Sequence, residues 1–169
     1  MADKDQIIKE KAEHRGIFDF PAFYAYANAT LTDWGYSVVE EKYSEKVSGN
    51  SREITVEWKA TRGLSDYFKI EVFIRFVLRG LTDVEVEMEG KKKKMNQGTI
   101  EAEIKGSLIR DPESKWESTP FYRFLKDLYV KYVIPARIDT AQDEVRSDVQ
   151  TYKEQLKSFL ALSGKRDQE

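Results

Sequence analysis

The sequence contains no cysteine, a single histidine and no long apolar run. A chain without cysteine forms no disulfide and has no thiolate for catalysis or metal binding. One histidine, His14 in a polar N-terminal segment, excludes metal sites with several histidines and gives no support to a catalytic triad. No segment approaches the roughly 18 consecutive apolar residues of a membrane span, and the charged N-terminus lacks the apolar part of a signal peptide. We therefore expect a cytoplasmic protein without membrane contact.

The sequence also lacks the motifs that mark common catalytic and cofactor sites. It has no Walker loop, dinucleotide-binding loop or nucleophile elbow, and "GKR" at Gly164 has no upstream glycine of a phosphate loop. Acidic side chains recur at helical spacing between Asp139 and Asp148, but no calcium-binding loop accompanies them, and a solvated helix face has the same spacing. We predict no cofactor, no metal site and no identifiable catalytic residue.

Charge of neither sign dominates, because 28 basic residues stand against 30 acidic residues and leave a net charge of -2. Such a balance gives no general attraction to nucleic acid or anionic lipid. With 169 residues, 40% of them hydrophobic, the chain is long enough for one core and short for two domains. We expect a flexible arm at residues 1–16, a single α+β domain at residues 17–162 and a disordered tail at residues 163–169.

Alternating apolar and polar residues predict strands through the middle of the chain. The longest stretch, "YFKIEVFIRFVLRGL" at residues 67–81, has one apolar face and one charged face that also carries Phe73 and Val77. A strand of this kind packs its apolar face on a core and turns the other face to solvent or to a partner.

Further strands are predicted on both sides of this stretch. Residues 53–60 alternate cleanly around Trp58, and shorter or longer alternations cover residues 84–89 and 100–108. Residues 36–47 alternate less regularly and are predicted to form an edge strand.

Helical signals precede and follow the strands. Asp19 is suited to cap a helix that has Pro21 in its first turn and ends at Gly35. A second helix is predicted to open at Ser118 and to break or kink at Pro135. Beyond this proline, apolar residues recur at steps of seven, four and three, which predicts a third helix with a narrow apolar seam. The predicted fold is α+β: an antiparallel sheet of four to five strands, with an N-terminal helix and two C-terminal helices packed mainly on one face.

Five residues are candidates for an interaction surface. Phe73, Val77 and Ile109 are apolar residues on the charged face of the sheet, and Val149 and Leu156 belong to the seam of the last helix. Both groups have a second explanation, because scattered apolar residues are common on protein surfaces and a helix lying on its own sheet uses the same spacing.

The clearest charge feature is a run of four lysines beside the Glu89–Gly90 turn. These residues are candidates for phosphate contacts: Lys91, Lys92, Lys93 and Lys94. The preceding glutamates can pair with them across a hairpin, and no aromatic ladder of the kind that binds single strands accompanies them.

Three functional hypotheses follow. The leading one is a non-enzymatic interaction or assembly protein, self-associating or bound to a protein partner through the outer face of the sheet or the last helix. The alternative is a carrier or enzyme that holds a small apolar ligand in a cavity between sheet and helices, because the many aromatics and Gly106 opposite large side chains suit a cavity. Nucleic-acid binding through the lysine-rich hairpin is the weakest of the three.

Overall fold

The computed structural model describes residues 3–65, 67–110, 120–121, 124–125 and 134–166, and this part of the chain contains five long strands and two long helices. In chain order these elements are β1 (Asp3–Phe18), α1 (Phe20–Asp33), β2 (Ser37–Ser48), β3 (Ser51–Gly63), β4 (Phe68–Met88), β5 (Lys91–Arg110) and α3 (Ile134–Arg166).

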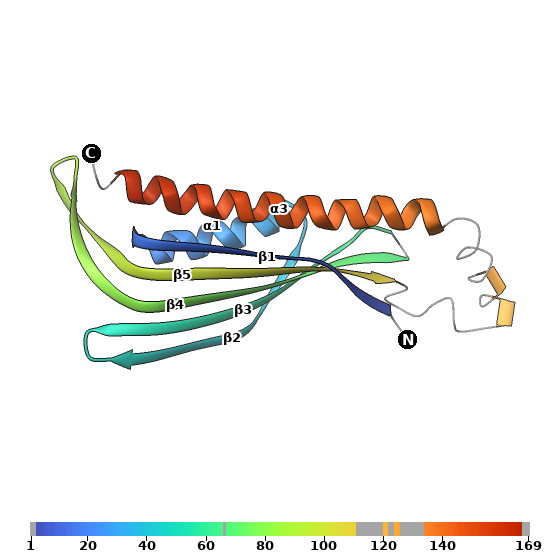
Figure 1. Ribbon diagram of the computed structural model, residues 1–169, viewed down its shortest axis with the longest axis horizontal. Coiled ribbons are helices and arrows are strands. Elements are labelled where there is room, and N and C mark those ends of the chain that lie inside the picture. Colours follow the sequence, from blue (N-terminus) through green and yellow to red (C-terminus); the bar gives the residue numbers. More distant parts are fainter. Residues whose placement is uncertain (1–2, 66, 111–119, 122–123, 126–133, 167–169) are drawn as a thin grey trace.

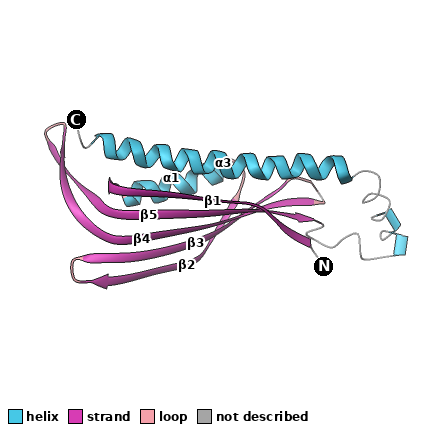
Figure 2. Ribbon diagram, in the orientation of Figure 1, coloured by secondary structure: helices cyan, strands magenta, loops and turns pink. Residues whose placement is uncertain are grey.

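The strands form one antiparallel sheet in the order β1-β5-β4-β3-β2. Successive strands from β2 to β5 are neighbours, whereas α1 carries the chain from β1 at one edge to β2 at the other. The sheet is strongly bent and both helices lie over its concave side, with α3 along β1 and β5 (Figure 1). Figure 2 shows the same two layers coloured by secondary structure. The predicted α+β class, the antiparallel sheet and the edge position of β2 are confirmed.

The concave face of the sheet is the core, as the alternation in residues 67–81 predicted. Six residues of β4 point into it and are 0–4% exposed: Phe68, Ile70, Val72, Ile74, Phe76 and Leu78. The Phe76 ring contacts Phe23 of α1 and Trp58 of β3 edge to face, with ring centroids 5.3 and 5.2 Å apart. Each fully buried side chain of this size contributes about 1.5–3 kcal/mol before entropy is subtracted, so these rows fix the helices onto the sheet.

The predicted signals of α1 are confirmed. The Asp19 carboxylate accepts a hydrogen bond from the Ala22 amide at 3.1 Å, and Pro21 lies in the first turn, where no backbone donor is needed. After Trp34 the chain leaves the helix through Gly35, whose φ of 90° is in the left-handed region that favours glycine.

The apolar seam of α3 packs on the sheet of the same chain. Its buried residues are Ala141, Val145, Val149, Tyr152, Leu156 and Leu160. The Tyr152 hydroxyl donates a hydrogen bond of 3.0 Å to the Ala27 carbonyl of α1, which joins the two helices. Pro135 lies in the first turn of α3, which begins at Ile134. Proline is tolerated at this position because no backbone donor is needed there, so it does not interrupt α3.

Polar contacts also hold α3 in place. Arg62 at the end of β3 lies 2.8 Å from both Glu144 and Asp148, and the Tyr36 hydroxyl donates to Asp148 at 2.6 Å. The Arg62 guanidinium lies over the Tyr36 ring, 5.2 Å from its centroid. Of the acidic residues of α3 between Asp139 and Asp148, Glu144 and Asp148 therefore bind a guanidinium, and the described residues contain no cluster suited to a metal ion.

The convex face is charged, as predicted, and it carries ionic pairs across the strands. One row of cross-strand neighbours runs Lys11, Glu103, Arg75, Glu57 and Lys42, so the sign of the charge alternates over all five strands. Within it, Arg75 lies 2.8 Å from Glu57, and Lys11 lies 3.9 Å from Glu103. An exposed pair of this kind contributes at most about 1 kcal/mol to the free energy of unfolding, so the row contributes less to stability than the core does.

The structure differs from the sequence-based prediction at both ends of the chain. Asp3–Phe18 forms β1, paired with β5, where the sequence predicted an arm without regular structure. Inward positions of β1 include Glu10, which pairs with Lys153 of α3 at 3.1 Å, so burial of this strand does not require an apolar residue at every second position. At the other end, α3 continues to Arg166, beyond the predicted end of the domain at residue 162 and into the stretch predicted to be a disordered tail.

The described residues contain one long C-terminal helix, α3, where the sequence predicted two helices. The first of the predicted pair, opening at Ser118, falls for the most part outside the described residues. The stretches that the sequence separated at Gly80 are one continuous strand, β4, which passes through a bulge between Arg79 and Thr82.

Candidate functional site

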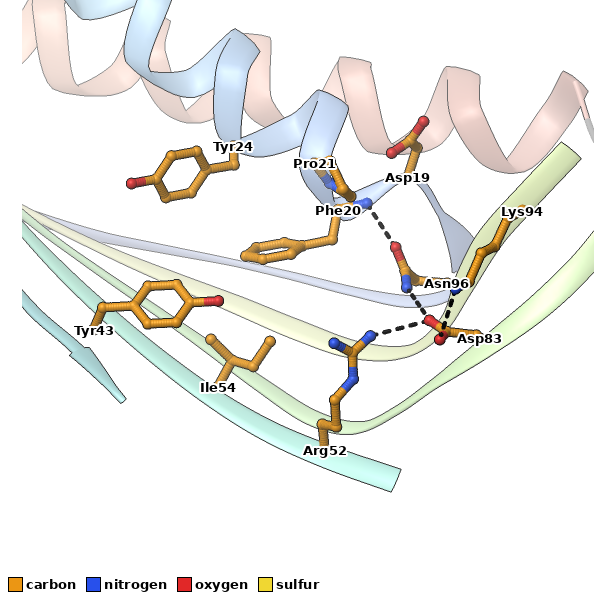
Figure 3. Close-up of a pocket in the computed structure, with 10 residues that line it drawn as sticks. All are labelled: Asp19, Phe20, Pro21, Tyr24, Tyr43, Arg52, Ile54, Asp83, Lys94 and Asn96. Carbon is orange, nitrogen blue, oxygen red and sulfur yellow. Dashed lines mark hydrogen bonds and ion pairs between the residues drawn. The ribbon is translucent and has the colours of Figure 1, made fainter. Parts of the chain in front are cut away.

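A pocket of about 520 Å³ opens on the concave side of the sheet (Figure 3). It lies between the first turns of α1 and the parts of β2, β3, β4 and β5 that are near the β2–β3 and β4–β5 turns. We call it the concave-face pocket. It is lined by Asp19, Phe20, Pro21, Tyr24, Tyr43, Arg52, Ile54, Asp83, Lys94 and Asn96. Its volume is within the range of about 300–1,000 Å³ that is typical of small-molecule sites.

One wall of the concave-face pocket is polar and centres on Asp83. Its carboxylate accepts hydrogen bonds from Arg52 Nη2 and Asn96 Nδ2, both at 3.0 Å, and lies 3.4 Å from Lys94 Nζ. Asn96, which is 7% exposed, also accepts a hydrogen bond of 3.0 Å from the Phe20 amide at the start of α1. The polar wall therefore holds three strands and the helix in one network (Figure 3).

The bulge in β4 places Asp83 in this wall. Before the bulge, Leu78 faces the core opposite Ile100, and after it Asp83 lies opposite Asn96 on the same side of β5. An extra residue at a bulge moves the following side chains to the other face of the sheet. Gly98 permits this geometry, because a Cβ there would lie 3.0 Å from the Arg79 carbonyl oxygen.

The other walls are apolar and largely aromatic. Phe20, Pro21 and Tyr24 come from α1, and Tyr43 and Ile54 come from β2 and β3 on the opposite side (Figure 3). Phe20 and Tyr43 project into the pocket from these two sides. Side chains of this kind offer flat apolar surfaces, so the pocket presents rings on two sides and a polar network at one end.

Glu40 fixes the aromatic wall from behind. It accepts hydrogen bonds from the Tyr24 hydroxyl at 2.5 Å and from Trp58 Nε1 at 3.2 Å. The Tyr24 and Trp58 rings also contact each other edge to face, with centroids 5.0 Å apart. Burial and the hydrogen bond to Glu40 raise the pKa of Tyr24 to about 12, so this wall is uncharged at neutral pH.

Tyr43 is half exposed and is the outermost ring of the pocket. Burial, followed by the nearby charge of Glu45, raises the pKa of its hydroxyl above the ordinary value. The hydroxyl is therefore neutral at physiological pH and is able to donate and to accept a hydrogen bond.

The five predicted interaction residues do not form one surface. Val149 and Leu156 are 1% and 0% exposed in the core, so the assignment of these two to an exposed contact is wrong. Their spacing is the one by which α3 packs on its own sheet. Phe73, Val77 and Ile109 do lie on the convex face, where each is half-buried. Phe73 stands between Lys59 and Lys105 on the neighbouring strands, whose aliphatic stems can cover part of its ring.

The four predicted phosphate-contact lysines form the exposed end of the β4–β5 hairpin. Lys94 and Lys92 lie opposite Glu85 and Glu87 in the register, as the sequence predicted. Lys93 lies 3.5 Å from Asp19, so the run is partly neutralised by acidic residues of its own chain. Lys94 is also the one residue of the run that lines the concave-face pocket.

The cavity expected beside Gly106 is filled. A Cβ at this position would lie 2.7 Å from methyl groups of both Val145 and Val149, and 3.1 Å from Ile8. At Gly106, α3 and β5 are therefore packed closely, and the pocket lies at the other end of the sheet.

A second hollow of about 510 Å³ lies on the helices, which we call the helical groove. It is lined by Tyr26, Gln150, Thr151, Glu154, Gln155, Ser158, Phe159 and Leu162. Tyr26 and Phe159 stack with ring centroids 4.6 Å apart, and Leu162 is 58% exposed.

Comparisons with family models, with curated proteins and with solved structures find no match to this chain. Within the described ranges, no helix has both the length and the apolar character needed to cross a membrane.

Proposed function

We propose that this protein binds a small molecule with an apolar body in the concave-face pocket. The observation that carries the proposal is the pairing of two aromatic walls with a polar network at one end of a single pocket. Sites for small molecules combine these features, because apolar side chains provide affinity and a few placed polar groups orient the ligand.

The network at the polar end is organised before any ligand arrives. Asn96 is held by Phe20 on one side and by Asp83 on the other, and Arg52 is held by Asp83. Groups that are already fixed lose little conformational entropy when a ligand binds, so the same contacts give more affinity.

Self-association, the leading hypothesis from the sequence, has less support. Two of its five residues lie in the core, and the three that remain are half-buried within a face of paired charges. Scattered, half-buried apolar residues are ordinary on a protein surface. A stable interface buries about 800 Å² on each partner, which requires a continuous patch rather than three separate residues.

Native mass spectrometry of the freshly purified protein provides a first test. We expect a population whose mass exceeds that of the chain by the mass of a co-purifying small molecule, and that is lost on unfolding. A single species of the mass of the chain would leave probe binding as the deciding experiment.

Tyr43→Ser is expected to weaken binding of the fluorescent probe phenylnaphthylamine by about tenfold, because it removes one ring from the pocket wall. Val39→Ser is the matched control, since Val39 is on the same edge strand and 57% exposed, compared with 50% for Tyr43, but has Lys59 of the convex face as its neighbour. Fluorescence titration measures both. Equal weakening by the two substitutions, or none by Tyr43→Ser, would remove the concave-face pocket as the binding site.

A further inference from the structure

The charged residues that line the concave-face pocket balance one another. Arg52 and Lys94 supply two positive charges, and Asp19 and Asp83 supply two negative ones. Each has a partner of opposite sign: Asp83 pairs with Arg52 and with Lys94, and Asp19 pairs with Lys93 at 3.5 Å. Arg52 has a second acidic neighbour in Glu45, at 3.4 Å. The pocket therefore offers no unpaired charge to a ligand.

This balance disfavours an ionic ligand. An anion would compete with Asp83 for Arg52 and Lys94, and a cation would compete with those two side chains for Asp83. In either case an existing pair is weakened, and an ionic ligand also gives up part of its own hydration on entering the pocket, whereas an exposed pair returns at most about 1 kcal/mol. An uncharged ligand leaves all of these pairs intact.

Uncharged hydrogen-bonding groups are also present. The Tyr43 hydroxyl projects into the pocket (Figure 3) and is neutral at physiological pH, as a phenol ordinarily is. A carboxamide has four hydrogen-bonding positions, and the contacts of Asn96 with Phe20 and Asp83 use two of them. A ligand hydroxyl, carbonyl or amide can therefore be recognised by neutral partners.

We propose that the ligand of the concave-face pocket is an uncharged molecule with a flat apolar body and a neutral polar group, and that the Asp83 network excludes anions. The aromatic side chains on two sides of the pocket select the flat body, and the neutralised polar wall selects against charge. This inference rests on the proposed function, since it describes the ligand of the same site.

Two probes that share one ring system test the inference. Phenylnaphthylamine is uncharged, and anilinonaphthalene sulfonate has the same rings with one sulfonate. Both are titrated by fluorescence into the full chain, and the quantity compared is the ratio of their dissociation constants. In the wild-type protein we expect the neutral probe to bind at least about tenfold more tightly than the anionic probe.

Asp83→Asn keeps the shape of the side chain but frees Arg52 and Lys94 from a negative partner. We expect this variant to bind the anionic probe about tenfold more tightly relative to the neutral probe, because Arg52 and Lys94, having lost the Asp83 carboxylate, attract a sulfonate more strongly. Glu101→Gln is the control, because it removes one carboxylate from the convex face, where Glu101 pairs with Arg79 at 3.7 Å. It should leave the ratio unchanged.

The outcomes separate the two proposals. If neither probe binds the wild-type protein, the proposed function fails. If both bind but the anionic probe binds more tightly, or if Asp83→Asn leaves the ratio unchanged, the selectivity inference is overturned while ligand binding stands. Circular dichroism confirms that each variant is folded before its ratio is interpreted.

Discussion

Ile74→Asp is expected to prevent the chain from folding. Ile74 is 0% exposed at the centre of the sheet, with Trp58 and Ile104 as its neighbours on the adjoining strands. An aspartate there would be a buried carboxylate among apolar side chains. The desolvation of such a charge costs several kcal/mol, which is comparable to the total stability of about 5–15 kcal/mol of a typical domain. Circular dichroism and thermal melting measure the loss.

Phe73→Asp is the matched control, one residue away on the convex face. The new carboxylate would lie between Lys59 and Lys105, so we expect the fold to be retained, with a stability change of no more than about 1 kcal/mol. Equal loss of folding in both variants would contradict the one-sided core. Size-exclusion chromatography of the Phe73→Asp variant also tests self-association, because an oligomer formed through this face would become smaller.

Gly106→Val is expected to destabilise the protein by about 3 kcal/mol, the upper end of the usual cost of overpacking a core. Even a single Cβ at this position would lie 2.7 Å from methyl groups of Val145 and Val149, and the two further methyl groups of valine increase the overlap. The chain can relieve the overlap only by moving α3 away from β5, which reduces packing along the seam. Urea unfolding measures the change in the free energy of unfolding.

Gly63→Val is the control for this substitution. Gly63 also lies in a strand, its φ is not in the left-handed region, and a Cβ there would have no neighbour within 4 Å. We expect it to be neutral or slightly stabilising, since valine favours strands. Adding Val149→Ala to Gly106→Val should recover part of the lost stability, because it removes one of the two closest methyl groups. No recovery would mean that the cost does not arise at the contact with α3.

Local patterns in the sequence were sufficient to predict most of the sheet and α1. The alternation around Trp58 and Ile74 predicted which face is buried. Successive side chains of a strand point to opposite faces, so the face that carries the apolar residues is the one that meets the core. Asp19, Pro21 and Gly35 predicted the ends of α1, because capping depends on residues close in sequence. Each of these features depends on residues close together in the chain, so it can be predicted from a single sequence.

Features that depend on distant partners were missed. The inward position of Glu10 in β1 is satisfied by Lys153, which lies 143 residues further along the chain, and nothing near Glu10 in the sequence indicates this pair. The seam of α3 has the spacing of a coiled coil and of a helix on a sheet alike, so Val149 and Leu156 were assigned to a contact surface although they lie in the core.

The concave-face pocket was missed for a related reason. The sequence predicts alternating stretches at residues 67–81 and 84–89 and leaves Asp83 between them, whereas a bulge continues the strand and turns Asp83 toward the core side. Gly80 in β4 and Gly98 beside it in β5 were the available signals, since isolated glycines inside strands mark bulges and close backbone contacts. That the two glycines lie close together was visible only in the folded chain.

Amide proton–nitrogen correlation spectra of the full chain, recorded during titration with phenylnaphthylamine, test the central claim most directly. Ligand binding in the concave-face pocket predicts that the largest shift changes fall on Phe20, Tyr43, Ile54 and their neighbours in the pocket wall. Largest changes at Phe159 and Leu162 in the helical groove, or small changes spread over the whole surface, would contradict the account.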